Sequence, residues 1–360
     1  MSHSSAKKNA SKGRGAGFNT PNRFERSFLE PLDVQIDSEA EDSSRKTLFY
    51  VDKSRSILAK NDSPDLPLTY SINPYRGCEH GCIYCYARPS HEYLGFSAGL
   101  DFESKIMVKQ DAPILLEKTL RGKRWQPQMV AFSGNTDCYQ PVERTLQLTR
   151  RCLEVFLRYR NPVGLITKNA LVLRDVDILQ QMAKFDIIHV MLSITTLDVD
   201  LARVMEPRTS TPAKRLQAIE ELAKAGIPVG VNVAPIIPGL TDEEMPAILR
   251  AAANHGATSA GYILLRLPGA VRPLFLEWVQ RTFPDRAPKI LNRISDTRNG
   301  ELSDAHFGTR MSGQGGIAEM IKRLFIINAQ KFNLMKRWSN LSTEHFVRGC
   351  PQQLEIFSSS

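Results

Sequence analysis

The chain of 360 residues contains only six cysteines, and they are unevenly placed. Three of them lie within eight residues, which is unlike the spread, even-numbered pattern of a disulfide framework. Long apolar runs are also missing, since no stretch of about 18 apolar residues could span a bilayer. The first residues, MSHSSAKKNASKGRG, include no apolar segment that could act as a secretory signal. Because clustered thiols need reducing surroundings, we expect a cytoplasmic protein without a membrane span.

The cysteine cluster lies in the loop 76–86, RGCEHGCIYCY, which spaces Cys78, Cys82 and Cys85 as C-x3-C-x2-C. Gly77 and Gly81 allow the sharp backbone turns with which a short loop wraps its sulfurs around one metal centre. Thiolates at this density suit zinc or an iron–sulfur cluster.

The number of available ligands separates these two metals. A structural zinc site needs four ligands, and without a second CxxC downstream only His80 or His91 could complete it. A cubane cluster held by three cysteines instead leaves one iron free to bind a substrate or cofactor.

The charge of the chain is compatible with a nucleic-acid partner but does not identify one. The formal net charge is +9. Residues 1–46 are polar and charged with few apolar residues to bury, so we expect a disordered arm there. Its basic residues come first and its acidic residues second. Because the two sets nearly cancel, most of the excess positive charge belongs to the folded part.

Apolar segments of strand length alternate with amphipathic segments of helix length from about residue 66 onward. The expected strands are 68–74, 129–133, 163–167, 187–194, 228–235 and 260–267. The expected helices between them are 112–121, 142–160, 172–184, 211–225 and 242–255. This alternation predicts an α/β fold, namely a β/α barrel or part of one, with its chemistry where the strands run into the following loops. A doubly wound open sheet is the competing architecture, although no GxGxxG follows the first strand.

Polar residues follow the ends of several expected strands. The segment 133–143, SGNTDCYQPVE, follows the second strand, Thr167-Lys168-Asn169 the third and Ser193-Ile194-Thr195-Thr196 the fourth. In a barrel these ends face one rim, which places hydroxyls, an acid and a lysine beside the cysteine loop. Each residue alone could simply cap a helix or face solvent, but together they favour a site for a small polar cofactor.

Several blocks of the sequence, taken together, resemble a known family. The blocks are RGCEHGCIYCYAR, SGNTDCYQPVE, LITKNALVLRD, LSITTLD, EPRTSTPAKRL, VNVAPIIPGLTD, GYILLRLP and FGTRMSGQG. The cysteine loop, with an aromatic residue before its third cysteine, resembles the signature of the radical S-adenosylmethionine (SAM) superfamily. The other blocks resemble its spore photoproduct lyase branch, in particular proteins called DNA repair photolyases by similarity.

This resemblance implies a fold, two cofactors and a reaction. The fold would be a partial (β/α)6 TIM-type barrel over residues 47–270, followed by a helical extension over 271–340 and a flexible tail over 341–360. Cys78, Cys82 and Cys85 would ligate a [4Fe–4S] cluster, and its open iron would chelate SAM. Reductive cleavage of SAM would give a 5′-deoxyadenosyl radical that abstracts hydrogen from a substrate.

The resemblance also implies further site residues. Its cofactor contacts would be Tyr84, Ser133, Thr136, Asp137, Lys168, Ser193 and Arg208. A lysine suits the carboxylate of SAM and hydroxyls suit its polar groups, while Arg208 could equally pair with Glu206.

The sequence departs from the lyase at one position, where Gly134 replaces the hydrogen-donor cysteine. Cys138 is therefore a candidate substitute donor, and Tyr84 and Tyr86 are candidate radical relays. Packing roles are the alternatives for all three residues.

The implied enzyme needs an external one-electron donor of the flavodoxin or ferredoxin type. Kinship and charge favour DNA or another nucleic acid as substrate. The alternatives are the same chemistry on a protein, RNA or metabolite, and a zinc-stabilised nucleic-acid-binding module. Near the C-terminus, Gln353-Leu354-Glu355-Ile356-Phe357 resembles the QLxLF peptide that binds the bacterial sliding clamp, although such a tail can also fold back on its own domain.

Overall fold

The computed structural model describes residues 13–24, 46–66, 68–336 and 341–349. Its centre is a seven-stranded sheet in the order β10-β9-β8-β7-β6-β3-β2. The strands are β2 (Leu58–Lys60), β3 (Tyr70–Ile72), β6 (Val130–Phe132), β7 (Val163–Thr167), β8 (Ile188–Ser193), β9 (Val229–Ile236) and β10 (Ser259–Leu264). All neighbours are parallel except β2 and β3.

The six parallel strands are those expected from the apolar runs, which confirms the α/β class. They follow one another across the sheet in chain order, without the reversal that defines a doubly wound sheet. Within the described residues β10 and β2 are not paired with each other, so the sheet is open along one side. The carboxyl ends of the parallel strands meet at one edge, as in a β/α barrel.

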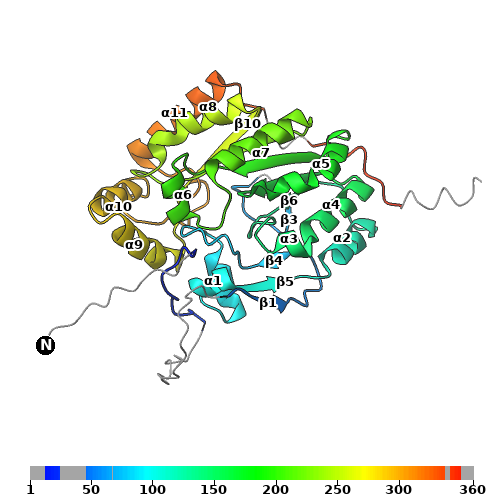
Figure 1. Ribbon diagram of the computed structural model, residues 1–360, viewed down its shortest axis with the longest axis horizontal. Helices are drawn as coiled ribbons and strands as arrows, with labels where there is room; N and C mark the ends of the chain where they lie inside the picture. Colours follow the sequence, from blue (N-terminus) through cyan, green and yellow to red (C-terminus); the bar gives the residue numbers. More distant parts are fainter. Residues whose placement is uncertain (1–12, 25–45, 67, 337–340, 350–360) are drawn as a thin grey trace, which may run out of the picture.

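Helices surround the strands (Figure 1). Those that follow the strands are α2 (Ala112–Arg121), α3 (Glu143–Leu146), α4 (Leu148–Tyr159), α5 (Val176–Ala183), α7 (Pro212–Lys224) and α8 (Met245–Asn254). The 3-10 turns are η1 (Arg88–Leu94), η2 (Ala170–Asp175) and η3 (Asp242–Glu244). The main core lies between these helices and the sheet, where Phe132, Leu165 and Leu192 are fully buried.

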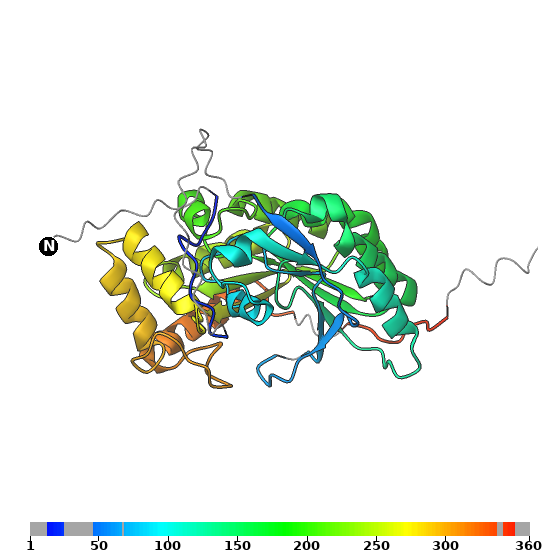
Figure 2. The same cartoon turned by 90° about the horizontal axis from the view of Figure 1, so that it is seen from below.

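A second, smaller core lies on the side of the cysteine loop. It joins α6 (Val199–Met205), α9 (Val271–Thr282) and α10 (Ala287–Asp296) to the loop, with Phe275 and Trp278 packed in the same cluster as Ile83 and Tyr84. Figure 2 shows α9 and α10, in yellow and orange, at one end of the molecule. The last helix, α11 (Gly315–Lys331), instead packs into the main core through Ala318 and Ile321.

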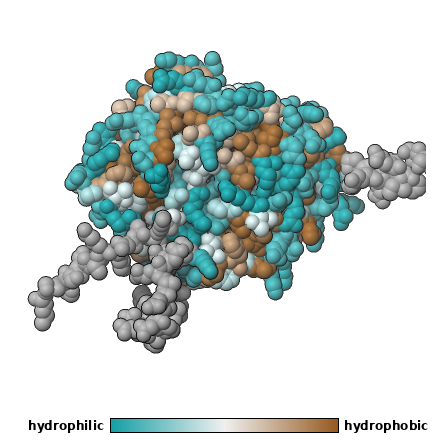
Figure 3. All heavy atoms as spheres, in the orientation of Figure 1, coloured by the Kyte–Doolittle hydropathy of each residue, from teal (hydrophilic) through white to brown (hydrophobic). Residues whose placement is uncertain are grey.

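A three-stranded sheet that the sequence did not predict leads into the cysteine loop. It consists of β1 (Leu48–Val51), β5 (Lys105–Val108) and β4 (Tyr75–Arg76), with β5 in the centre. All four residues of β1 are exposed, and Figure 3 shows apolar surface at the lower edge of the molecule, where β1 and β5 lie. No alternation of buried and exposed residues marks β1, so the period of a half-buried strand is missing.

Part of the expected disordered arm has a defined position. Residues 13–24, dark blue in Figures 1 and 2, run between α1 (Leu100–Ser104) and α9. The approach is close, because a Cβ on Gly99 would lie 2.2 Å from the carbonyl oxygen of Phe18. Residues 1–12 and 25–45 of the arm, and the tail beyond residue 349, lie outside the described residues. In the part of the chain that is described, no helix has the length and apolar character to cross a membrane.

Candidate cluster and cofactor site

The cysteine loop begins at the end of β4 and is fixed by backbone hydrogen bonds. The amide of Cys78 donates to Phe102 O at 2.9 Å, and the amide of Ile83 donates to Met205 O at 3.0 Å. Gly77 adopts a φ of 80°, and a Cβ there would lie 3.0 Å from the ring of His91. The glycine is therefore needed both for its backbone conformation and for the space it leaves.

The buried ion pair of Arg88 and Glu103 holds the cysteine loop in place. Arg88 is fully buried and donates to Cys82 O at 2.8 Å and to Gly99 O at 3.0 Å, while it pairs with Glu103. The Glu103 carboxylate also accepts from the amides of Gly15 at 3.0 Å and Ala16 at 2.8 Å. This single carboxylate joins the N-terminal segment 13–24 to the cysteine loop. Sequence reasoning missed both charged residues, because neither belongs to the cysteine pattern.

The three cysteines of the loop are free thiols. Cys78 and Cys82 are 6% and 7% exposed, and Cys85 is intermediate. Burial raises the pKa of the Cys78 thiol, and the charges of Asp137, Cys82 and Cys85 raise it further, so the three groups lie close enough to influence one another. A bound metal centre would reverse this effect, because coordinated thiols lose their protons.

The donor set fits an iron–sulfur cluster better than zinc. His80 Nδ1 lies 3.4 Å from Asp137 Oδ2, and its Nε2 lies 3.2 Å from Asn169 Nδ2, so both nitrogens have protein partners. His91 is buried between Phe96 and Phe102. Among the described residues, no group of three His, Cys, Asp or Glu side chains is arranged around a single ion. A four-iron cubane is larger than one ion, so its thiolate ligands stand further apart. Of the two histidines that could complete a zinc site, His80 is thus already engaged. The ring nitrogens of His91 have no hydrogen-bond partner among the described residues, and its ring packs against two phenylalanines.

A buried charge cluster lies beside Tyr84. Glu206 pairs with Arg215 and with Lys168, whose Nζ is 3.2 Å from Glu206 Oε1. The hydroxyls of Tyr84 and Thr195 also donate to Glu206. Burial alone would raise the pKa of Glu206, but the charges of Arg215 and Lys168 outweigh it and hold the pKa well below its usual range. With Glu206 ionised, two cations face one anion, which leaves a positive charge next to the cysteine loop.

Lys168 is the member of this cluster that can best reach a ligand. Its side chain is 16% exposed, whereas that of Arg215 is 1% exposed. Its Nζ donates to Ala234 O at 2.9 Å and to Thr195 at 3.2 Å, and it lies 5.6 Å from the centre of the Tyr84 ring. Lys168 therefore lies between the carboxyl end of β7 and the ring of Tyr84, the residue before Cys85.

The polar residues after β6 connect three parts of the site. Asp137 accepts from Thr167 at 2.7 Å and from the amide of Lys168 at 2.8 Å, in addition to its contact with His80. The hydroxyl of Thr136 donates to Tyr75 O at 3.0 Å. Neither residue caps the following helix α3, which no side chain of the described residues caps. Asp137 connects the segment after β6 to the end of β7 and to His80, and Thr136 connects it to β4.

The other expected contacts lie in different surroundings. Ser133 has a φ of 80°, and its hydroxyl accepts from the amide of Cys138 at 2.8 Å. Ser193 is buried at the end of β8, and its carbonyl accepts from Arg215 at 2.9 Å.

Arg208 does not pair with Glu206, so that alternative is wrong. It lies 3.6 Å from Glu79 and donates to the hydroxyl of Thr47. Glu206 is neutralised by Arg215 on α7 instead, a pairing that the sequence analysis missed.

The two remaining candidates for radical chemistry differ in exposure. Cys138 has no exposed surface and belongs to the main core, which matches the packing role. Tyr86 is 49% exposed, and its hydroxyl donates to Gly134 O at the end of β6. The structure thus brings Tyr84 and Tyr86 to the site and places the thiol of Cys138 away from the surface.

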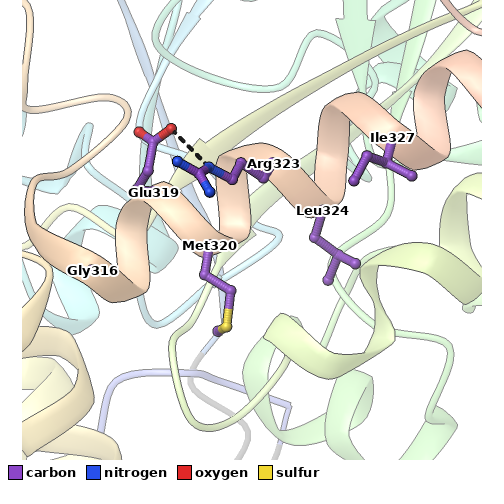
Figure 4. Close-up of a pocket in the computed structure, with 6 residues that line it drawn as sticks. All are labelled: Gly316, Glu319, Met320, Arg323, Leu324 and Ile327. Atoms are coloured by element: carbon purple, nitrogen blue, oxygen red, sulfur yellow. Dashed lines mark ion pairs between the residues drawn. The ribbon is translucent and has the colours of Figure 1, made fainter.

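A hollow on the surface of α11 is separate from this site. It is lined by Gly316, Glu319, Met320, Arg323, Leu324 and Ile327, all from one helix (Figure 4). None of the candidate residues contributes to it.

Comparison with known proteins identifies the class. The family model of the radical SAM superfamily matches residues 72–252, which is half of the chain and spans the cysteine loop and four of the six parallel strands in full. The chain therefore belongs to the radical SAM superfamily.

Two similar proteins are themselves described as uncharacterized. One from Mycobacterium tuberculosis is 36% identical over 222 residues, covering 61% of this chain and 65% of its own length. One from Methanocaldococcus jannaschii is 34% identical over 176 residues, covering 49% of this chain and 63% of its own length. The chain thus spans less than two thirds of the length of either relative.

Solved structures of spore photoproduct lyase share the fold. The lyase complexed with dinucleoside spore photoproduct has a TM-score of 0.56 at 17% identity, over 79% of each chain. A doubly substituted mutant of the lyase, with bound AdoMet and the same dinucleoside, has a TM-score of 0.54 at 17% identity, over 81% of this chain and 80% of that one. At this identity the likeness concerns the fold.

Proposed function

We propose that this protein is a radical SAM enzyme that binds a [4Fe–4S] cluster through Cys78, Cys82 and Cys85 and abstracts hydrogen from a nucleic-acid substrate. When bound, the reduced cluster and SAM supply a 5′-deoxyadenosyl radical for that abstraction. The observation that supports this most strongly is the set of three free thiols on one loop, next to a positive charge that Glu206 does not neutralise.

The protein's own residues bind and orient the cofactors in this proposal. Arg88 and Glu103 hold the loop rigid, so that the three thiolates keep their relative positions. Lys168 supplies a point charge for the carboxylate of SAM, which would replace one of the oxygens that it now contacts. The ring of Tyr84 shields the same region from water.

The substrate assignment depends on less direct support. The shared fold with spore photoproduct lyase and the net charge of +9 favour nucleic acid. The same chemistry on a protein or a metabolite is the alternative. An external electron donor of the flavodoxin or ferredoxin type belongs to the proposal. The clamp-binding peptide 353–357 lies outside the described residues and stays a prediction.

Anaerobic cluster reconstitution tests the cysteine ligands. We expect about four irons per chain and a brown protein for the wild type. Cys82→Ala should lose most of the iron and the colour. Cys152→Ala is the matched control, because Cys152 is a buried cysteine of α4 within the main core, and it should keep both. A colourless wild type that contains zinc, or a Cys82→Ala variant with full iron content, would contradict the proposal.

A further inference from the structure

Three arginines lie near one another at the open side of the sheet, and one of them, Arg266, lies beside Tyr86. Arg266 follows β10, Arg298 follows α10, and Arg310 lies in the segment before α11. In the described part of the chain, the acidic groups whose charges act on Arg266 are Asp65 and Asp304. The three arginines thus outnumber these two aspartates, and the region carries an excess positive charge.

Two of these arginines are engaged by the protein itself. Arg298 donates to Leu265 O at 2.7 Å and to Thr309 O at 3.2 Å. Arg310 pairs with Asp65, whose carboxylate also accepts from the amide of Gly308 at 2.6 Å. These contacts hold the segment before α11 against the loop between β2 and β3, across the open side of the sheet.

Arg266 has no comparable partner. Its Nη1 contacts the sulfur of Met311 at 3.6 Å, which is a weak acceptor. Its Nε is buried without a hydrogen-bond partner, and no carboxylate of the described residues lies within ion-pair distance. Burial lowers the pKa of Arg266, and the charge of Arg310 lowers it further. A partly desolvated guanidinium without a counter-ion favours the binding of an anion, and its planar fork fits a phosphate.

The position of Arg266 relates it to the cluster loop. Its Cζ lies 5.7 Å from the centre of the Tyr86 ring, and Tyr86 directly follows Cys85. The neighbouring Leu265 packs in the same apolar cluster as Cys82. An anion bound by Arg266 would therefore lie beside Tyr86, next to the proposed cluster ligand Cys85.

An exposed aromatic ring stands near the same arginines. Phe307 is 59% exposed, and Arg310 Cζ lies 4.4 Å from the centre of its ring. Exposed aromatic rings next to basic side chains are the usual means of binding unpaired nucleotides, because the bases stack on the ring while the cations contact phosphates.

We propose that Arg266 binds a phosphate group of the substrate and that Phe307 stacks against a base of the same molecule. This inference rests on the proposed function, since it assigns substrate contacts to the same site. The phosphate can belong to a nucleic-acid strand or to a free nucleotide, and the experiment separates these two sources.

The test is fluorescence anisotropy of a labelled single-stranded 12-nucleotide oligonucleotide, titrated with reconstituted protein under anaerobic conditions. Arg266→Gln should weaken binding about tenfold and reduce the slope of log K against log salt by about 0.7, as expected for one lost phosphate contact on a single strand. The matched control is Arg250→Gln, which removes the same charge from an exposed position on α8 and should change the affinity less than twofold. Iron content and thermal melting establish that the variants are folded and loaded.

Competition with a nucleoside monophosphate identifies the source of the phosphate. If the mononucleotide displaces the oligonucleotide at similar concentrations and Arg266→Gln weakens both, the substrate is a nucleotide; if only strands compete, it is a nucleic acid. Equal binding by Arg266→Gln and Arg250→Gln, or binding of neither the oligonucleotide nor the mononucleotide by the wild type, would overturn the inference. Neither binding result depends on SAM cleavage. A failure of the proposed radical chemistry would instead appear in the assay for 5′-deoxyadenosine.

Discussion

Replacing Glu206 with glutamine tests whether one carboxylate compensates two buried cations beside the cysteine loop. The substitution keeps the size of the side chain but leaves Arg215 and Lys168 without a counter-ion. Breaking a buried ion pair by removing one partner costs about 3–5 kcal/mol. Because glutamine can still accept from Thr195, we expect the lower end, about 3 kcal/mol, in the free energy of unfolding of the apo-protein at pH 7.

The pH dependence of this difference follows from the pKa of Glu206. The folded-state pKa lies well below the unfolded value of about 4.3, so the stabilisation is present above pH ~4.3 and is lost as the pH falls toward the folded pKa. Glu206→Gln has no such group. The gap between wild type and variant should therefore narrow by about 1.4 kcal/mol for each pH unit below ~4.3.

Urea unfolding of the reduced apo-proteins, followed by circular dichroism at pH 7 and pH 3.5, measures both effects. The control is Glu117→Gln, which removes a half-exposed carboxylate paired with Arg158 and should change stability much less. Equal stability of Glu206→Gln and the control at pH 7, or a gap that stays constant at low pH, would refute the reasoning.

Two further predictions concern the supports of the loop. A Cβ on Gly15 would lie 1.8 Å from Gly81 O, so Gly15→Val should lower the unfolding free energy by about 1–3 kcal/mol. Gly316→Ala is the control and should not lower it, because a Cβ there meets no atom of the described residues within 4 Å. Equal urea midpoints of the two variants would contradict the close packing of residues 13–24. Burial lowers the pKa of His91 to about 4. The unfolded chain therefore binds a proton below pH ~6.5 that the folded chain does not, and the wild type should lose about 2 kcal/mol between pH 7 and pH 5 that His91→Phe does not lose. Parallel pH profiles of these two proteins would show that His91 is not held neutral.

The sequence predicted the sheet well because its central strands β6, β7 and β8 are buried on both faces. Several of the parallel strands are near-continuous apolar runs, and β7 was placed with its observed bounds, Val163–Thr167. The sheet of β1, β5 and β4 could not be found in this way, because β4 has two residues and β1 is exposed along its whole length. Its pairing depends on tertiary contacts rather than on a local pattern.

The site was predictable where its residues are close in sequence. The spacing of the three cysteines is a local signal. The ion-pair partner of Glu206 instead depends on where the first turn of α7 places Arg215. Arg208, two residues after Glu206, was the natural candidate from sequence, but α7 brings Arg215 to the carboxylate instead. The tie between Glu103 and the amide of Gly15 spans 88 residues, and no sequence pattern indicates it.

The most direct measurement of the central claim is the formation of 5′-deoxyadenosine. Reconstituted protein is reduced with dithionite in the presence of SAM and an oligonucleotide, with Cys82→Ala treated in parallel. The account predicts 5′-deoxyadenosine from the wild type and none from Cys82→Ala. A wild type that carries a full, reducible cluster and yet forms no 5′-deoxyadenosine with any oligonucleotide or nucleotide tested would contradict it.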